Sequence, residues 1–207
     1  NTPALIHGGP FANIAHGCNS IIATNMGRKL AKYVITEAGF GADLGAEKFL
    51  DIKAKQAGFE PAAVVIVATI RALKMHGGVK KKELGPENVE ALIKGLSNLQ
   101  KHIENIQQFK VPYVVAINSF ITDTDAETKA LADFLGGNGH PWSLSEVWEK
   151  GGEGAVDLAR KVIKEIDTKP NNFTRMYNDE DTIAEKIEKV CKKVYGADGV
   201  EFSGAAK

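Results

Sequence analysis

Short apolar runs alternate with amphipathic helical patterns along this chain, and this alternation limits the fold more than any other feature. The runs are rich in β-branched residues and lie at 5–7, 33–36, 62–70 and 111–118. Nearly continuous apolar strands are typical of a parallel sheet that is covered on both faces. The helical patterns begin at Pro86 and, further along, cover 126–135, 155–166 and 181–194. We therefore expect an α/β fold with a doubly wound, mostly parallel sheet.

Composition argues against several classes of partner. The 26 basic and 26 acidic residues give a formal net charge of zero, so nothing favours nucleic acid or an anionic membrane surface. Cys18 and Cys191 match neither a metal-ligand spacing nor a disulfide framework, and they fit a reducing cytosol. No apolar stretch approaches the ~20 residues that span a bilayer. We expect a cytoplasmic protein without a nucleic-acid or membrane partner.

A glycine-rich turn follows the apolar run at 33–36 and precedes a predicted helix that begins near Asp43. Gly39, Gly41 and Gly45 let backbone N–H groups approach a ligand, and the positive end of the helix dipole faces the same place. The spacing G-x-G-x-x-x-G is not a dinucleotide fingerprint, and no Gly-Lys-Ser/Thr follows to make a nucleotide P-loop. An anion site and a plain tight turn both remain open.

Polar and aromatic residues gather after the other predicted strands, where ligands of open α/β sheets bind. His7, Asn13 and His16 lie among glycines after the first run, although a hydrogen-bonded structural role is the common one for a histidine. His7 and His16 lack a third ligand at a suitable spacing, so we expect no metal centre. Phe120 and Trp148 lie beside turns, and they either sandwich a flat ring or pack in the core.

Four longer motifs resemble formate–tetrahydrofolate ligase, also called formyltetrahydrofolate synthetase. They are HGGPFANIAHGCNS at 7–20, TEAGFGADLGAEKF at 36–49, LSEVW at 144–148 and KGGEG at 150–154. The likeness runs essentially end to end. It implies a reaction in which ATP phosphorylates formate to formyl phosphate, which N10 of tetrahydrofolate then attacks to give 10-formyltetrahydrofolate, ADP and phosphate.

The resemblance also implies a division of the chain. The chain matches only the middle of the family, whose nucleotide P-loop lies upstream of residue 1 and whose third domain lies downstream of residue 207. Asn1 in place of Met, just before an apolar run, likewise suggests a piece of a longer protein. Residues 1–108 would be the end of a nucleotide and formyl-phosphate domain of P-loop-NTPase type. Residues 109–207 would be a folate-binding α/β domain.

Specific residues follow from the same resemblance. The positions that sandwich the pterin and aminobenzoyl part of folate are Phe120, Leu144 and Trp148. The catalytic neighbourhood of formyl phosphate contains His7 and Asn13, and the phosphate-binding turn comprises Gly39, Gly41, Ala42 and Asp43. The resemblance implies ATP with Mg²⁺, formate and tetrahydrofolate as ligands, with room for a monovalent cation. It also implies a homo-oligomer for the full-length protein and no complete reaction for this piece alone.

Two alternatives to a ligase fragment stay open at this point. The first is a non-enzymatic nucleotide-binding or assembly module on an α/β scaffold, which would bind nucleotide without binding folate. The second is a structural piece of an oligomer interface, which would associate with rising concentration and bind no ligand.

Overall fold

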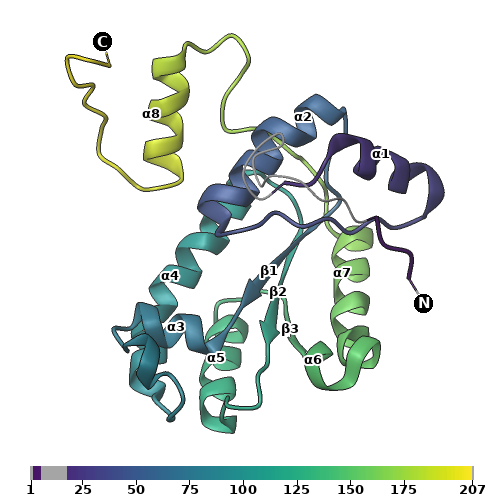
Figure 1. Cartoon of the computed structure of the whole chain (residues 1–207), viewed down its shortest axis with the longest axis vertical. Coiled ribbons are helices and arrows are strands. Elements are labelled where there is room, and N and C mark those ends of the chain that lie inside the picture. Colours follow the sequence, from purple (N-terminus) through teal and green to yellow (C-terminus); the bar gives the residue numbers. More distant parts are fainter. Residues whose placement is uncertain (1, 6–17, 207) are drawn as a thin grey trace. The chain divides into compact units, whose positions relative to one another are not determined.

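The computed structural model describes residues 2–5 and 18–206 and divides the chain into two compact units (Figure 1). Unit 1 comprises residues 1–61 and 173–207, and unit 2 comprises residues 62–172. One continuous stretch of chain therefore forms unit 2, whereas two stretches from opposite ends of the sequence form unit 1.

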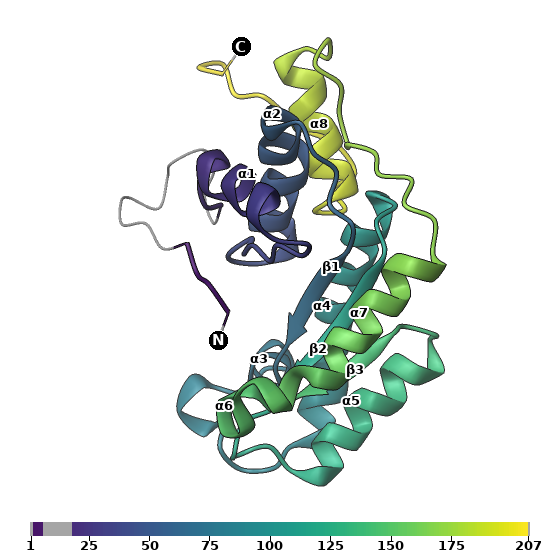
Figure 2. The same cartoon turned by 90° about the vertical axis from the view of Figure 1, so that its right-hand side faces the viewer.

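Unit 2 contains a sheet of three parallel strands in the order β1-β2-β3 (Figure 2). The strands are β1 (Val64–Ala68), β2 (Tyr113–Asn118) and β3 (Trp142–Ser145). Val64 pairs with Tyr113, and Val115 pairs with Trp142. The four residues 114–117 of the central strand are all buried, as the nearly continuous apolar run predicts for a strand covered on both faces. The predicted α/β class with a parallel sheet is confirmed.

Helices cover both faces of this sheet (Figure 1). They are α3 (Ile70–His76), α4 (Val89–Gln108), α5 (Asp125–Gly137), α6 (Val147–Lys150) and α7 (Val156–Thr168). α4 contacts α3, α5 and β1, whereas α7 contacts β2 and β3. The helix predicted from Pro86 begins three residues later, because the Asn88 side chain accepts a hydrogen bond from the Ala91 N–H at 2.9 Å and caps the helix there.

A buried ion pair joins α3 to α5. Lys74 Nζ lies 2.8 Å from Glu127 Oε1, and the two side chains are 1% and 0% exposed. Lys74 also donates to the Pro86 carbonyl at 2.9 Å, and Glu127 accepts from the Asn88 N–H at 2.8 Å. Both charges are thus paired and hydrogen-bonded, which is the condition for burying them without a large loss of stability.

Unit 1 is built around a long helical run. Its helices are α1 (Ile21–Leu30), α2 (Ala54–Ala57) and α8 (Ile183–Lys193), together with the π-helical turns η1 (Ala42–Ala46) and η2 (Phe49–Lys53). The run from η1 to α2 ends at Gly58, whose φ of 67° provides the left-handed cap. Phe49, Leu50 and Ala54 of this run are buried, as are Met176 and Val194 from the far end of the sequence.

One strand prediction fails in unit 1, and a second lies mostly outside the described residues. Residues 33–36 form no strand, and Tyr33 and Ile35 are 52% and 96% exposed. Of the predicted run at 5–7, Leu5 lies outside any strand and residues 6 and 7 lie outside the described part of the chain. Within the described part of the chain, no strand pairs with residues 33–36. An apolar run forms a strand only where another strand pairs with it. Only an isolated antiparallel bridge, between Cys18 and Ala38, lies close to the run.

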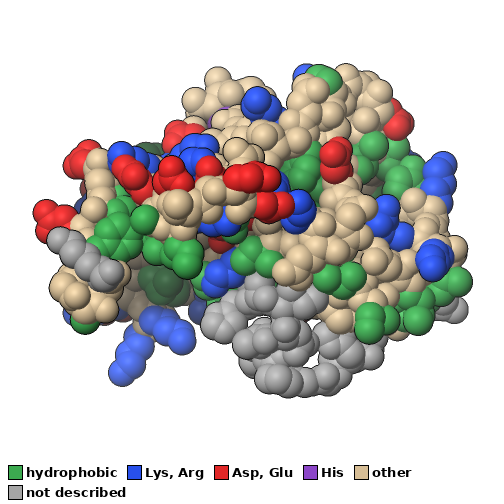
Figure 3. Space-filling view, turned by 90° about the horizontal axis from the view of Figure 1, so that it is seen from above, with side chains coloured by type: hydrophobic (Ala, Val, Ile, Leu, Met, Phe, Trp, Pro, Cys, Tyr) green, Lys and Arg blue, Asp and Glu red, His purple; other side chains and the backbone are tan. Residues whose placement is uncertain are grey.

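Charged groups are mixed on the surface. On the face of the molecule shown in Figure 3, acidic and basic side chains lie among one another instead of forming a field of one sign. This distribution agrees with the equal numbers of acidic and basic residues. Within residues 2–5 and 18–206, no helix combines the length and the apolar character that crossing a bilayer requires.

Candidate functional site

A small hollow opens at the carboxyl ends of β2 and β3 in unit 2. Its volume is about 150 Å³, and it is lined by Ser119, Phe120, Ile121, Asp123, Glu146, Trp148 and Glu149. The two strand ends are held together just before the hollow, because Ser119 N–H donates to the Ser145 carbonyl at 3.0 Å. Ligands of parallel α/β sheets bind at this edge, so the hollow lies where the topology predicts a site.

The turn after β2 fixes Phe120. The Phe120 N–H donates to Asp123 Oδ2 at 2.9 Å, and the Asp123 N–H donates to the Phe120 carbonyl at 2.9 Å. Thr124 and Glu127 then cap α5 through reciprocal side-chain to backbone hydrogen bonds. Burial raises the pKa of Asp123 above its usual value. Asp123 is therefore a loop-closing residue whose side chain also lines the hollow, a second role that the sequence did not reveal.

Trp148 lies on α6, the short helix that follows β3, and its side chain is 65% exposed. An ion pair of 2.8 Å between Glu146 and Lys150 spans the same helical turn. Packing in the core does not account for a tryptophan with this exposure, so that alternative fails for Trp148. Trp148 is one of the residues that line the hollow, so its exposed ring is available to stack on a flat ligand.

Leu144 occupies a different position from the two aromatic residues. It lies within β3, pairs with Ile117 of β2 and is half-buried. Among the described residues that line the hollow, Phe120 and Trp148 are present and Leu144 is not. The structure thus brings together two of the three residues that the sequence predicts for a folate site.

A glycine loop supports α6 from behind. The Glu146 N–H donates to the Gly154 carbonyl at 3.1 Å. A Cβ atom on Gly154 would lie 2.5 Å from the Glu146 carbonyl carbon and 2.9 Å from the Val147 nitrogen, so no larger residue fits without moving α6. Gly151 has a φ of 58°, which favours glycine.

Gly154→Ala is expected to lower the free energy of unfolding of unit 2 by about 1–3 kcal/mol and to shift the indole N–H signal of Trp148. The reason is that the added methyl group displaces the start of α6. Urea unfolding and ¹H–¹⁵N spectra measure both effects. Gly152→Ala is the matched control, since a Cβ there meets no described atom within 4 Å. Equal behaviour of the two variants would contradict this role of Gly154.

The glycine-rich turn in unit 1 leads into a helix, as predicted. Gly41 is the N-cap of the run that begins at Ala42, and the N–H groups of Leu44 and Gly45 donate to its carbonyl at 3.0 Å and 2.9 Å. The first N–H groups of a helix have no acceptor within it, so they and the helix dipole favour an anion here. A Cβ on Gly45 would lie 1.6 Å from the Gly39 carbonyl oxygen. Gly45 therefore serves close packing within the turn.

Phe40 is a feature of this turn that the sequence reading missed. It has a φ of 68°, a left-handed conformation that is uncommon for an aromatic residue, and its side chain is 69% exposed. Strained backbone that persists in a fold often marks a ligand site. The sequence feature that could have pointed to this residue is the position of Phe40 between two glycines.

Cys18 and Lys53 lie beside the glycine turn. Cys18 pairs with Ala38, its thiol contacts the Gly45 carbonyl at 3.9 Å, and burial raises its pKa. Lys53 is fully buried and donates to Asn19 Oδ1, and burial lowers its pKa to about 8. His7 and Asn13, the predicted catalytic residues, lie outside the described residues. Within the described part of the chain, no group of three or more His, Cys, Asp or Glu side chains is placed to hold a metal ion.

Comparison with models of protein families gives a match over the whole sequence. The family model described as formate–tetrahydrofolate ligase matches residues 1–207. The match includes all four motifs that carry the resemblance, so that resemblance is confirmed.

Proposed function

The chain belongs to the formate–tetrahydrofolate ligase family, and we propose that unit 2 holds the folate half-site for ligating formate to tetrahydrofolate. The observation that carries this proposal is the shared hollow of Phe120 and Trp148. The two residues follow neighbouring strands, and both line the same hollow at the carboxyl edge of the sheet. Two aromatic side chains on one hollow suit a flat heterocycle such as a pterin.

The size and polarity of the hollow support one ring system. Its volume of about 150 Å³ is below the ~300–1,000 Å³ of a pocket that encloses a drug-sized ligand. Three residues with carboxylate oxygens, Asp123, Glu146 and Glu149, line the same hollow. These oxygens accept hydrogen bonds from the amino and ring N–H groups of a pterin. In this proposal, the half-buried side chain of Leu144 supports the ring from within β3.

We assign the phosphate-binding role in unit 1 to Gly39, Gly41, Ala42 and Asp43, with His7 and Asn13 as catalytic residues. The helix start at Ala42 supports the first assignment, and the resemblance alone supports the second. Formyl phosphate is a mixed anhydride, so N–H dipoles on its oxygens stabilise it and a dry pocket protects it. N10 then attacks the formyl carbon, and an oxyanion forms. N10 loses its proton to water or to phosphate, and phosphate leaves as the carbonyl is restored. Holding N10 against that carbon provides much of the acceleration.

The parts of the ligase reaction divide between regions of the chain. We propose that residues 1–108 belong to a nucleotide and formyl-phosphate part of P-loop-NTPase type, and that 109–207 belong to the folate part. The β1–β2 ladder crosses residue 108, so the two parts share one sheet in this proposal. The 207 residues contain no Gly-Lys-Ser/Thr, and we assign none of them to Mg²⁺ or to a monovalent cation. We expect this chain alone to bind folate without forming 10-formyltetrahydrofolate.

Trp148→Ala is expected to weaken tetrahydrofolate binding by about 2 kcal/mol, which is roughly 30-fold in Kd. The substitution removes one of the two rings that stack on the pterin. Calorimetric titration of the 207-residue chain measures the change. Trp148→Phe keeps an aromatic face and should recover most of the affinity.

Val147→Ala is the control for this test. Val147 lies on the same short helix, is 43% exposed and does not appear among the described residues that line the hollow. Its removal should leave the Kd for tetrahydrofolate unchanged. Unchanged affinity in Trp148→Ala, or no binding by the unaltered chain, would contradict the folate half-site. Saturable nucleotide binding without folate binding would instead favour a non-enzymatic nucleotide-binding module.

A further inference from the structure

Two carboxyl groups are buried side by side in unit 1. Glu47 and Asp51 lie one helical turn apart on the run from η1 to η2, and they are 6% and 1% exposed. Asp51 Oδ1 accepts a hydrogen bond of 2.8 Å from the N–H of Met176. Its second oxygen, Oδ2, is buried and has no hydrogen-bond partner among the described residues. The Glu47 carboxyl group is the acidic neighbour of Asp51, and the two groups affect each other's pKa. Two buried negative charges at this distance repel each other strongly.

A single proton on the pair removes this repulsion. A protonated Glu47 carboxyl donates to Asp51 Oδ2, which gives that oxygen its missing partner and leaves the pair with one negative charge. Burial and the neighbouring Asp51 raise the pKa of Glu47 to about 7, and burial raises that of Asp51 to about 6. The pair therefore loses its shared proton around neutral pH.

Two of the basic residues around the pair also have other partners. The groups that face the pair are Lys48 on its own helical run and Cys18, Arg175, Tyr177, Lys193 and Tyr195 from other elements. Arg175 pairs with Asp179 at 2.9 Å, and Lys193 donates to the Met176 carbonyl at 3.1 Å. Burial and the two carboxyl groups raise the pKa of Tyr177 to about 12, so its phenol stays neutral.

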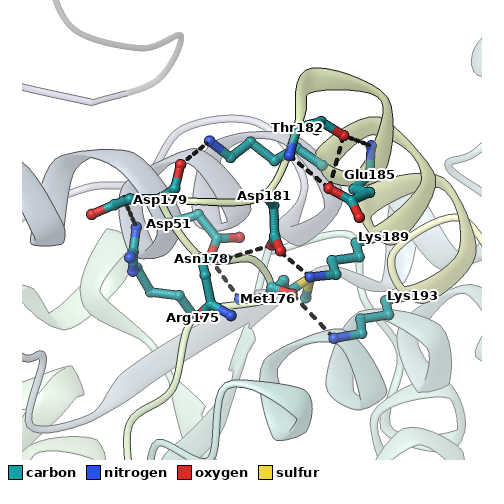
Figure 4. A network of polar contacts seen from close by, with 11 residues as sticks. Asp51, Arg175, Met176, Asn178, Asp179, Asp181, Thr182, Glu185, Lys189 and Lys193 are labelled. Carbon is teal, nitrogen blue, oxygen red and sulfur yellow. Dashed lines mark hydrogen bonds and ion pairs between the residues drawn. The ribbon is translucent and has the colours of Figure 1, made fainter.

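The segment held by Asp51 is braced by its own polar contacts (Figure 4). Asp181 accepts from the Asn178 N–H at 2.7 Å and pairs with Lys189 of α8 at 2.5 Å. At the end of this segment, the Tyr195 hydroxyl donates to the Asp43 carbonyl at 3.2 Å. The contact at Met176 is thus connected, through residues 176–195, to the first turn of the helix that follows the glycine turn. Lys55 of α2 also pairs with Asp179 of this segment, where both side chains are about half exposed.

We propose that Glu47 and Asp51 share one proton and together clasp residues 175–195 onto the helical run, so that losing the proton loosens the glycine turn and weakens its hold on an anion. Asp51 and Glu47 are positioning residues, since they act on the turn through Met176 and Tyr195. The second half of the proposal rests on the phosphate site proposed for Gly39–Asp43.

The test follows the N–H signal of Met176 in ¹H–¹⁵N spectra of the 207-residue chain between about pH 4 and pH 8.5. The clasp predicts that the chemical shift of this N–H changes in a step near neutral pH, because the N–H is hydrogen-bonded to Asp51. Glu47→Gln keeps a donor for Asp51 Oδ2 without an ionisable proton, and it should leave one step at lower pH. A Met176 step near pH 4 in the unaltered chain, or an unchanged step in Glu47→Gln, would overturn the clasp.

Sulfate tests the coupling to the turn, because its charge is constant over this pH range. Its Kd, followed at the Ala42 and Asp43 N–H signals, should rise at least threefold from about pH 6 to pH 8 in the unaltered chain and stay level in Glu47→Gln. Tyr195→Phe should remove this dependence and keep the Met176 step. Equal pH dependence in all three chains would overturn the coupling. A normal Met176 step with no sulfate binding at either pH would support the clasp and contradict the proposed phosphate site.

Discussion

Replacing Lys74 with alanine is expected to lower the free energy of unfolding of unit 2 by about 3–5 kcal/mol, the largest effect of any side-chain truncation considered for this unit. Lys74 and Glu127 are almost completely buried, and the substitution leaves the Glu127 carboxylate without its cation. Burial by itself raises the pKa of Glu127, but hydrogen bonds from Lys74 and from the N–H groups of Asn88 and Thr124 outweigh it and hold that pKa below its usual value. Without Lys74, the pKa of Glu127 should rise.

Urea unfolding followed by tryptophan fluorescence measures this effect, because Trp142 and Trp148, the two tryptophans of the chain, both lie in unit 2. Lys129→Ala is the control, since Lys129 and Asp133 form an ion pair whose side chains are 75% and 64% exposed. That pair should contribute about 0–0.5 kcal/mol.

A double variant separates loss of pairing from loss of packing. Lys74→Met with Glu127→Leu removes both charges and keeps apolar volume, so it should recover most of the stability lost in Lys74→Ala. Its Asn88 and Thr124 N–H groups lose an acceptor, so recovery should be incomplete. A cost for Lys74→Ala no greater than that for Lys129→Ala would show that the buried pair contributes little.

The sequence was sufficient to predict two of the three strands of unit 2, β1 and β2, but it did not predict β3. The sequence has continuous β-branched runs at 62–70 and 111–118 and a capped, single-stripe helix between them. A parallel pair is the natural arrangement for these elements, and β1 and β2 form within the two runs. The order of elements places Phe120 directly after a predicted strand, whereas the strand before Trp148 is evident only in the structure. Local pattern is informative here because each element carries its own apolar face and its own cap.

The apolar pattern was misleading where a segment depends on contacts with residues that are distant in the sequence. Residues 33–36 resemble a strand, yet period and composition do not say whether another strand will pair with them. The sequence also provided no indication of β3, in which Leu144 pairs with Ile117. The hydrogen bond from Met176 to Asp51 spans 125 positions, and no short-range pattern reveals such a contact. The sequence feature that could have indicated this contact is Asp51, a charged residue on the buried face beside Leu50 and Ala54.

Glu47→Gln is expected to make unit 1 more stable than the unaltered chain at about pH 8 and about equally stable at pH 5. Folding raises the pKa of Glu47 from 4.5 to about 7, so the folded state binds the proton more tightly than the unfolded state does. A raised pKa of an acid stabilises the fold below the unfolded pKa, and that contribution is lost as pH rises through the folded pKa. The loss therefore falls between about pH 4.5 and pH 7 and amounts to roughly 3 kcal/mol for a shift of this size.

Urea unfolding at three pH values, followed by far-UV circular dichroism, tests this dependence. Tryptophan fluorescence identifies the transition of unit 2 in the same samples, so the remaining change belongs to the helices of unit 1. Glu60→Gln is the matched control, because Glu60 lies in unit 1 and is exposed, and its loss should not change the pH slope. If the unaltered chain and Glu47→Gln lost stability in parallel from pH 5 to pH 8, the slope would have another origin. Glu47 would then be an ordinary carboxylate, and Asp51 alone would hold Met176.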